Sequence, residues 1–121
     1  MDSEKLKCVY VMMHERMRNL VKVGQSSNIK ERVSVLNTSV PEDFIVVLVY
    51  KTDSCVELEE LVNQALKKEG VHRGSRNTKE FFECTKEHVT EVINQIVEEH
   101  PTMKGSYLDN ETIKNLLRRT R

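Results

Sequence analysis

The chain has 121 residues, and its 19 basic and 19 acidic residues give a formal net charge of zero. This length suits one domain that buries a single core without help from disulfides or metal. The balanced charge excludes a globally basic surface, so nucleic-acid contacts must come from local patches. The 3 cysteines are widely spaced, which predicts reduced and buried thiols.

The chain shows no pattern typical of a targeting signal or a membrane span. No basic start is followed by an apolar region, and no apolar run approaches the roughly 20 residues that a spanning helix needs. We therefore expect a soluble, intracellular protein of the cytoplasm or nucleus, without membrane contacts.

Two β-type runs near the N-terminus, Cys8–Met12 and Leu20–Gly24, predict a hairpin. An antiparallel pairing centred on Arg16 places Tyr10 opposite Lys22, so that both share one face of the hairpin. A slip of one residue would instead move one of them to the other face. The shared face is thus a prediction for a structure to test.

A helix is expected to follow the hairpin and to run to about Thr38. Its N-cap candidates are Ser26, Ser27 and Asn28. Its apolar positions lie on one face, namely Ile29, Val33 and Leu36. Arg32 lies at the edge of that face, where a guanidinium group can emerge at the rim of the core.

The run Phe44–Tyr50 is continuously apolar and predicts a central strand covered on both faces. Ser54 and Glu57 have the spacing of a capping box, which opens a helix to about Glu69. In that helix, Glu59 borders the apolar face while Glu60 points away from it.

The second half of the chain predicts a loop and two more helices. Residues 71–79 are cationic and without periodicity, which is typical of an exposed loop. A short strand-like piece at residues 80–84 precedes a helix that Thr85 can cap and that His100 and Pro101 end. A short basic helix from Asp109 follows a linker.

These elements predict an α/β fold with a small, mainly antiparallel sheet of three strands, flanked by helices, with residues 80–84 as a short addition. Residues 1–100 are expected to form the main domain. Residues 101–121 are expected to form a linker and a short basic C-terminal helix.

The order of these elements resembles the GIY-YIG endonuclease superfamily, and within it the small stand-alone branch of phages, large DNA viruses and microbial genomes. The resemblance covers residues 8 to about 97. It is carried by VYV and VKVG in the two strands, ERVSVLNTSVP in the first helix, ELEELVNQAL in the second helix and the segment KEFFEC.

The resemblance implies a GIY-YIG-like fold and a metal-dependent DNA endonuclease, and it assigns roles by position. Tyr10 matches the first signature tyrosine, and Lys22 stands where the second tyrosine usually lies. Arg32 matches the catalytic arginine, and Glu59 matches the metal-binding glutamate. Two helper positions depart from the family pattern, at Leu36 and Asn63.

These residue types suit phosphodiester hydrolysis. One carboxylate such as Glu59 suits one Mg²⁺ or Mn²⁺ that keeps its waters and is bound weakly without substrate. Arg32 offers a planar cation for the scissile phosphate. Tyr10 or Lys22 can position or deprotonate the water, and the sequence leaves open which of them is the base.

Further cations are expected to contact nucleic acid, mainly DNA, either duplex or branched, with RNA left open. They lie in the loop and in the basic tail, namely His72, Arg73, Arg76, Lys79, Arg118 and Arg119. Two other functions compete with cleavage. One is a nucleic-acid-binding module that has lost activity, which Leu36 and Asn63 favour. The other is a protein-interaction domain, or a homodimer, that uses the apolar face of the C-terminal helix.

Overall fold

The computed structural model describes residues 6–29, 31, 44–73 and 81–119. Its strands in chain order are β1 (Cys8–His14), β2 (Leu20–Ser26), β3 (Phe44–Lys51), β4 (His72–Arg73), β5 (Phe81–Glu83) and β6 (Ser106–Tyr107). The helices described are α2 (Cys55–Lys68), α3 (Lys86–Glu99) and α4 (Asn110–Arg119), with a 3₁₀ turn, η1, over Pro101–Met103.

The strands form one 6-stranded sheet in the order β4-β5-β2-β1-β3-β6, and each neighbouring pair is antiparallel. The α/β class and the C-terminal helix are confirmed, but the predicted sheet of three strands is too small. The addition near residues 80–84 is present as β5. Strand β4 lies in the expected loop and β6 in the expected linker. Strands of two or three residues are too short to leave a periodic pattern in a sequence.

The run Phe44–Tyr50 does form a strand, β3, but it is not the middle of the sheet. Strands β2 and β1 lie at the centre, and the outer neighbour of β3 is the 2-residue strand β6. The apolar character of β3 instead reflects burial on both faces, since Tyr50 packs on one side and Val49 on the other.

The hairpin of β1 and β2 has a register shifted by two positions from the expected one. Tyr10 lies opposite Gly24, and Lys22 lies opposite Met12. The turn is set by His14, whose Nδ1 accepts hydrogen bonds from the backbone N–H groups of Arg16 and Met17, each at 3.1 Å. A shift of two positions preserves the face of every side chain, so the predicted shared face of Tyr10 and Lys22 is confirmed.

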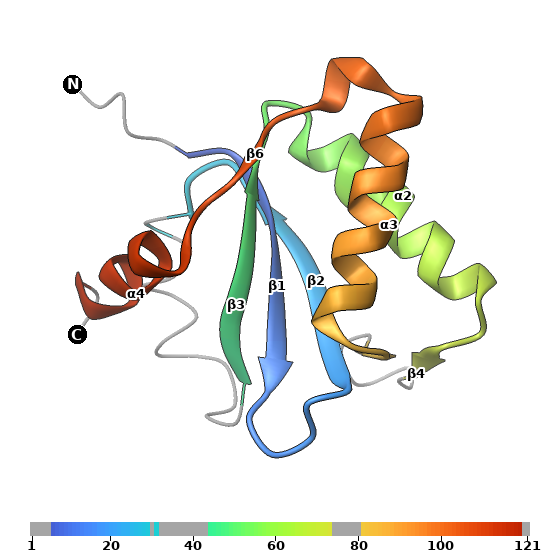
Figure 1. The fold of residues 1–121 in the computed structure, drawn as a ribbon, viewed down its shortest axis with the longest axis horizontal. Helices are drawn as coiled ribbons and strands as arrows, with labels where there is room; N and C mark the ends of the chain where they lie inside the picture. The colour runs from blue at the N-terminus through green and yellow to red at the C-terminus, as the bar shows by residue number, and fades with distance from the viewer. Residues whose placement is uncertain (1–5, 30, 32–43, 74–80, 120–121) are drawn as a thin grey trace.

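Two hydrophobic clusters cover the two faces of the sheet. On one face, Val9 and Val11 of β1 pack with α2 and α3. On the other face, Cys8, Tyr10 and Met12 pack with Ile29 and with Ile113 of α4. Figure 1 shows α2 and α3 together on one side of the strands and α4 on the other. The α2–α3 layer holds most of the large buried side chains, including Phe82 and Leu58.

The start of α3 agrees with the prediction from the sequence, whereas the start of α2 differs from it. Thr85 caps α3 as expected, and its side chain accepts a hydrogen bond from the His88 N–H at 3.1 Å. Ser54 precedes α2, but its side chain makes no capping bond. The Thr52 hydroxyl instead accepts from the Ser54 N–H at 3.2 Å and donates to the Met103 carbonyl at 2.8 Å. The hydroxyl that organises this helix start is therefore two residues earlier than expected.

The segment after residue 100 packs closely against β3. The Gly105 N–H donates to the Tyr50 hydroxyl at 2.6 Å, and the rings of Tyr50 and Tyr107 meet edge to face with centroids 4.6 Å apart. The Leu108 N–H donates to the Val49 carbonyl at 3.0 Å. The domain boundary at residue 100 stays a prediction, but the residues that follow it contribute directly to the sheet and to the core.

None of the helices within the described ranges has the length and apolar character that crossing a bilayer requires.

Replacement of Gly105 by alanine should destabilise the protein. An added Cβ would lie 1.8 Å from the Lys51 carbonyl oxygen, which is backbone and cannot move aside cheaply. We expect the free energy of unfolding in urea to fall by about 2–3 kcal/mol, as in other overpacked sites. The matched control is Gly70→Ala, where nothing lies within 4 Å but φ is +77°. That control should cost only about 1 kcal/mol. Equal losses in the two variants would mean that residues 101–121 do not dock on β3.

Candidate functional site

Tyr10 lies in the middle of β1 and is only 5% exposed. Its ring extends across the hairpin onto the backbone of Gly24, where an added Cβ would lie 2.7 Å from both Cζ and the hydroxyl oxygen. Gly24 is therefore the residue that leaves room for the tyrosine. The sequence indicated this glycine only as the end of a strand, because a cross-strand contact depends on register.

Lys22 is half-buried on β2, on the same face as Tyr10 and Gly24. Its Nζ atom lies 5.7 Å from the centroid of the Phe81 ring. Phe81 belongs to β5, which pairs with β2 through Leu20 and Val21. Continued by one residue, this antiparallel register sets Phe81 across from Lys22 on the same face. Tyr10, Lys22 and Phe81 thus come from three adjacent strands and share one surface.

A helical turn at Ile29 begins where the sequence predicted a helix start. The Asn28 side chain accepts from the Glu31 N–H at 3.4 Å, and Ile29 is fully buried in the same cluster as Tyr10. The start of this helix is therefore fixed on the Tyr10 face of the sheet. Arg32 and Leu36 lie outside the described residues, so the position assigned to the catalytic arginine stays a prediction.

Glu59 lies on α2 and is half-buried, whereas Glu60 beside it is exposed. The predicted difference between the two carboxylates is confirmed. Helix α2, however, packs on the face of the sheet opposite to Tyr10. It contacts β2, and the thiol of Cys55, one turn before Glu59, lies 3.6 Å from the Gln25 side-chain oxygen.

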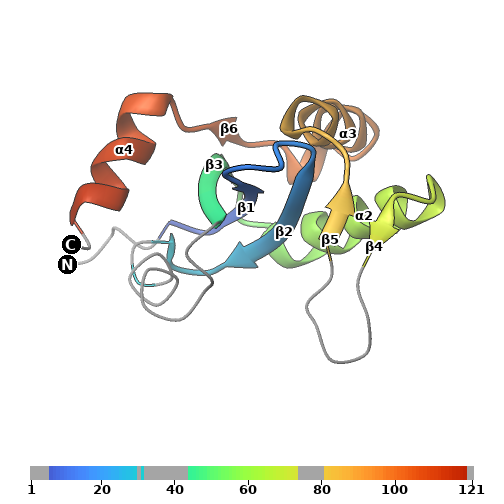
Figure 2. The ribbon, with the colours of Figure 1, turned by 90° about the horizontal axis from the view of Figure 1, so that it is seen from below.

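The outer edge of β2 near α2 borders both faces of the sheet. Strand β5 pairs with β2 only at Leu20 and Val21, so among the described strands none pairs with the outer edge of β2 at Gly24 to Ser26. Figure 2 shows β5 beside one end of β2, with α2 close to both strands. The Cys55 thiol contacts Gln25 on this part of β2, so the start of α2 lies beside this edge, while the placement of Glu59 near Tyr10 stays a prediction.

A metal ion at this site would have few protein ligands. Among the described residues, no three His, Cys, Asp or Glu side chains gather as a metal cluster. A single half-buried carboxylate such as Glu59 fits Mg²⁺, which is often bound by one or two carboxylates and completed by water and substrate phosphate. It does not fit a structural zinc site, which needs four ligands.

Burial also controls the chemistry of a thiol beside the site. Cys8 is on the Tyr10 face and fully buried. Burial, and then the nearby thiol of Cys55, raise the pKa of Cys8 to about 12. The described thiols are free, with Cys8 and Cys55 buried and Cys84 half-buried, so the prediction of reduced thiols is confirmed while full burial of Cys84 is not. A neutral Cys8 is a packing residue and not a nucleophile.

The other cations predicted to contact nucleic acid are not brought together by the described part of the chain. Arg76 and Lys79 lie outside it. His72 and Arg73 form β4, where Arg73 is opposite Phe81, and Arg118 and Arg119 are in α4, at the other edge of the sheet. Their roles stay predictions.

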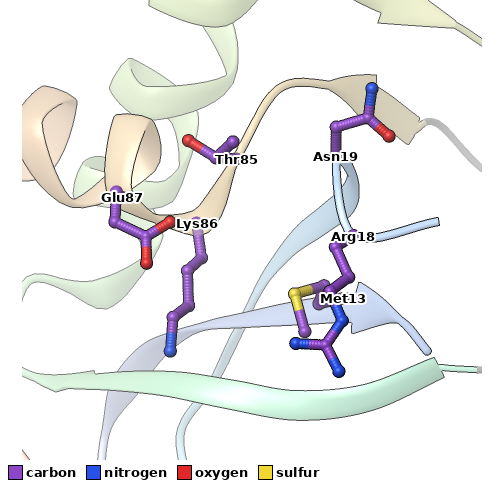
Figure 3. A pocket seen from close by; sticks show the side chains of 6 residues that line it. All are labelled: Met13, Arg18, Asn19, Thr85, Lys86 and Glu87. Carbon is purple, nitrogen blue, oxygen red and sulfur yellow. The ribbon is translucent and has the colours of Figure 1, made fainter. Parts of the chain in front are cut away.

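A pocket of about 410 Å³ lies at the turn end of the hairpin, beside the start of α3. Its lining residues are Met13, Arg18, Asn19, Thr85, Lys86 and Glu87. In Figure 3 the side chains of Arg18 and Lys86 extend in the same direction. Glu87 also lines the pocket, so the charges are partly balanced. Met13 packs with the α2–α3 layer, which places this pocket away from the Tyr10 face.

The fold and this surface define a small α/β domain with a tyrosine, a lysine and an aromatic ring on one face of an antiparallel sheet. The chain belongs to the T5orf172 domain family, whose model matches residues 7–97. This is a phage-related domain of a nuclease group, and it points to a function connected with nucleic acid. Comparison with curated proteins and with solved structures gives no match.

The contact between Tyr10 and Gly24 can be tested through stability. Gly24→Ala should lower the free energy of unfolding by about 1–3 kcal/mol, because the new methyl group displaces a buried ring. The same change should cost much less in a Tyr10→Ala background. We expect a coupling energy of about 1 kcal/mol or more from urea unfolding of the four proteins. Additive losses would contradict the contact.

Proposed function

We propose that this protein is a metal-dependent endonuclease that hydrolyses phosphodiester bonds in DNA. The observation that carries the proposal is the shared face of Tyr10 and Lys22, in a chain whose family is connected with nucleases. A phenol and an ammonium group on one surface supply a proton acceptor or donor and a cation. Attack of water on a phosphodiester needs both of these.

Tyr10 and Lys22 would act on the attacking water. The ring of Tyr10 is held by burial and by its contact with Gly24, so its hydroxyl has little freedom to move. Lys22 is half-buried on the neighbouring strand and brings a positive charge to the same surface. Either group can orient the water, and the one that is deprotonated can accept its proton. We propose that the two act as a pair.

Arg32 and Glu59 would complete the site. The arginine would bind the scissile phosphate through its planar guanidinium group and stabilise the charge that builds on it. Glu59 would hold one Mg²⁺ or Mn²⁺, which when bound would neutralise phosphate charge. The half-burial of Glu59 supports this role over the exposed Glu60.

The decisive variants are Glu59→Ala, Arg32→Ala and Glu60→Ala. Nicking of plasmid or branched DNA in Mg²⁺ or Mn²⁺ should be abolished by Glu59→Ala and lowered by about 10²–10³-fold by Arg32→Ala, as when a group that stabilises transition-state charge is lost. Glu60→Ala is the matched control and should change little, because Glu60 is exposed one position away.

The assay should cover duplex, single-stranded, branched and RNA substrates. Equal activity of the Glu59 and Glu60 variants would refute the site assignment. If the wild-type protein cuts none of the substrates but still binds DNA, the protein is a nucleic-acid-binding module on this fold, and the proposed cleavage is wrong. Gel-shift binding of the same substrates with EDTA present separates these two results.

A further inference from the structure

Phe81 is an aromatic residue beside Lys22, and no predicted role includes it. It is half-buried on β5, and its ring centroid is 5.7 Å from the Lys22 Nζ. This distance is within the roughly 6 Å at which an ammonium ion is attracted to the negative face of an aromatic ring. The contact joins β2 to β5, two of the three adjacent strands that form this surface.

A lysine on a strand normally extends its ammonium group into water, which hydrates it strongly. Lys22 instead is half-buried and lies over the neighbouring strand. Its four-carbon side chain has many rotamers, and a partner that favours one of them fixes the direction of the charge. Because Phe81 sits across from Lys22, the favoured direction runs along the shared surface toward β5, on the side of β2 opposite to β1.

An aromatic partner has a chemical effect that a carboxylate would not have. A carboxylate cancels the positive charge of a lysine, whereas a ring attracts the ammonium ion and leaves its charge and N–H donors in place. Phe81 therefore directs the ammonium group without neutralising it.

We propose that Phe81 is a positioning residue, which holds the Lys22 ammonium group on the Tyr10 face of the sheet so that it is already in place when a phosphodiester binds. The role rests on the proposed function of Lys22. Phe81 itself touches neither the phosphate nor the water. Its neighbour Phe82 points to the other face, where it is a core residue with 1% exposure.

The test compares Phe81→Leu with Phe81→Tyr in the full-length protein. Leucine keeps apolar bulk but removes the ring, and tyrosine keeps the ring, so the two variants separate packing from attraction. In NMR spectra, the ε-methylene protons of Lys22 should lose their ring-current shift in Phe81→Leu and keep it in Phe81→Tyr. Lys22→Met identifies the resonance. No change in Phe81→Leu would overturn the proposal, whether or not the protein cleaves DNA.

The second readout is single-turnover cleavage at saturating DNA. Phe81→Leu should lower the rate by roughly tenfold, within the range expected from one cation–π contact, and Phe81→Tyr should restore it. In a Lys22→Met background, Phe81→Leu should have no further effect. An equal further loss in that background would show that Phe81 acts through packing alone.

Failure of this proposal can be distinguished from failure of the proposed function. If the wild-type protein cleaves DNA and Phe81→Leu cleaves it equally well, the positioning role is wrong and the nuclease assignment stands. If the wild-type protein cleaves nothing, the NMR comparison still decides whether Phe81 holds Lys22. Thermal unfolding of each variant confirms that the compared proteins are folded.

Discussion

Burial of β1 on both faces is the constraint on which the remaining structure depends. From Cys8 to Met12 each side chain is nearly inaccessible to water, with alternate residues packing against different layers. Val9 and Val11 join the layer of α2 and α3, which holds the larger core. The even positions, including Tyr10, are covered by Ile29 and by Ile113 of the C-terminal helix. The Tyr10 hydroxyl therefore belongs to a row of buried side chains, and the alternation of β1 side chains between the two faces is unbroken.

This arrangement explains why segments far apart in the sequence meet around one strand. The start of the helix at Asn28, the β5 strand and the last helix are each short or irregular, and each contacts the central hairpin or its neighbour. The α2 helix packs in the other layer and contacts β2, where the Cys55 thiol meets the Gln25 side chain.

The sequence predicted the long elements well, because their apolar residues repeat with the period of a strand or a helix. The two hairpin strands, the strand at Phe44, the helices α2 and α3 and the different exposure of Glu59 and Glu60 all follow from that pattern. The hairpin register did not, since it depends on the turn, in which the His14 ring accepts two backbone hydrogen bonds. No local periodicity in the sequence predicts strands β4 and β6 or the contact of Gly105 with Tyr50, because these features depend on contacts with other parts of the chain.

The hairpin turn also has a consequence for the tautomer of His14. Its Nδ1 atom accepts hydrogen bonds from two backbone N–H groups, so that nitrogen must carry a lone pair and no proton. The neutral ring is therefore the tautomer with its hydrogen on Nε2. The turn between β1 and β2 therefore depends on the orientation of a single ring, because one nitrogen accepts from both backbone groups.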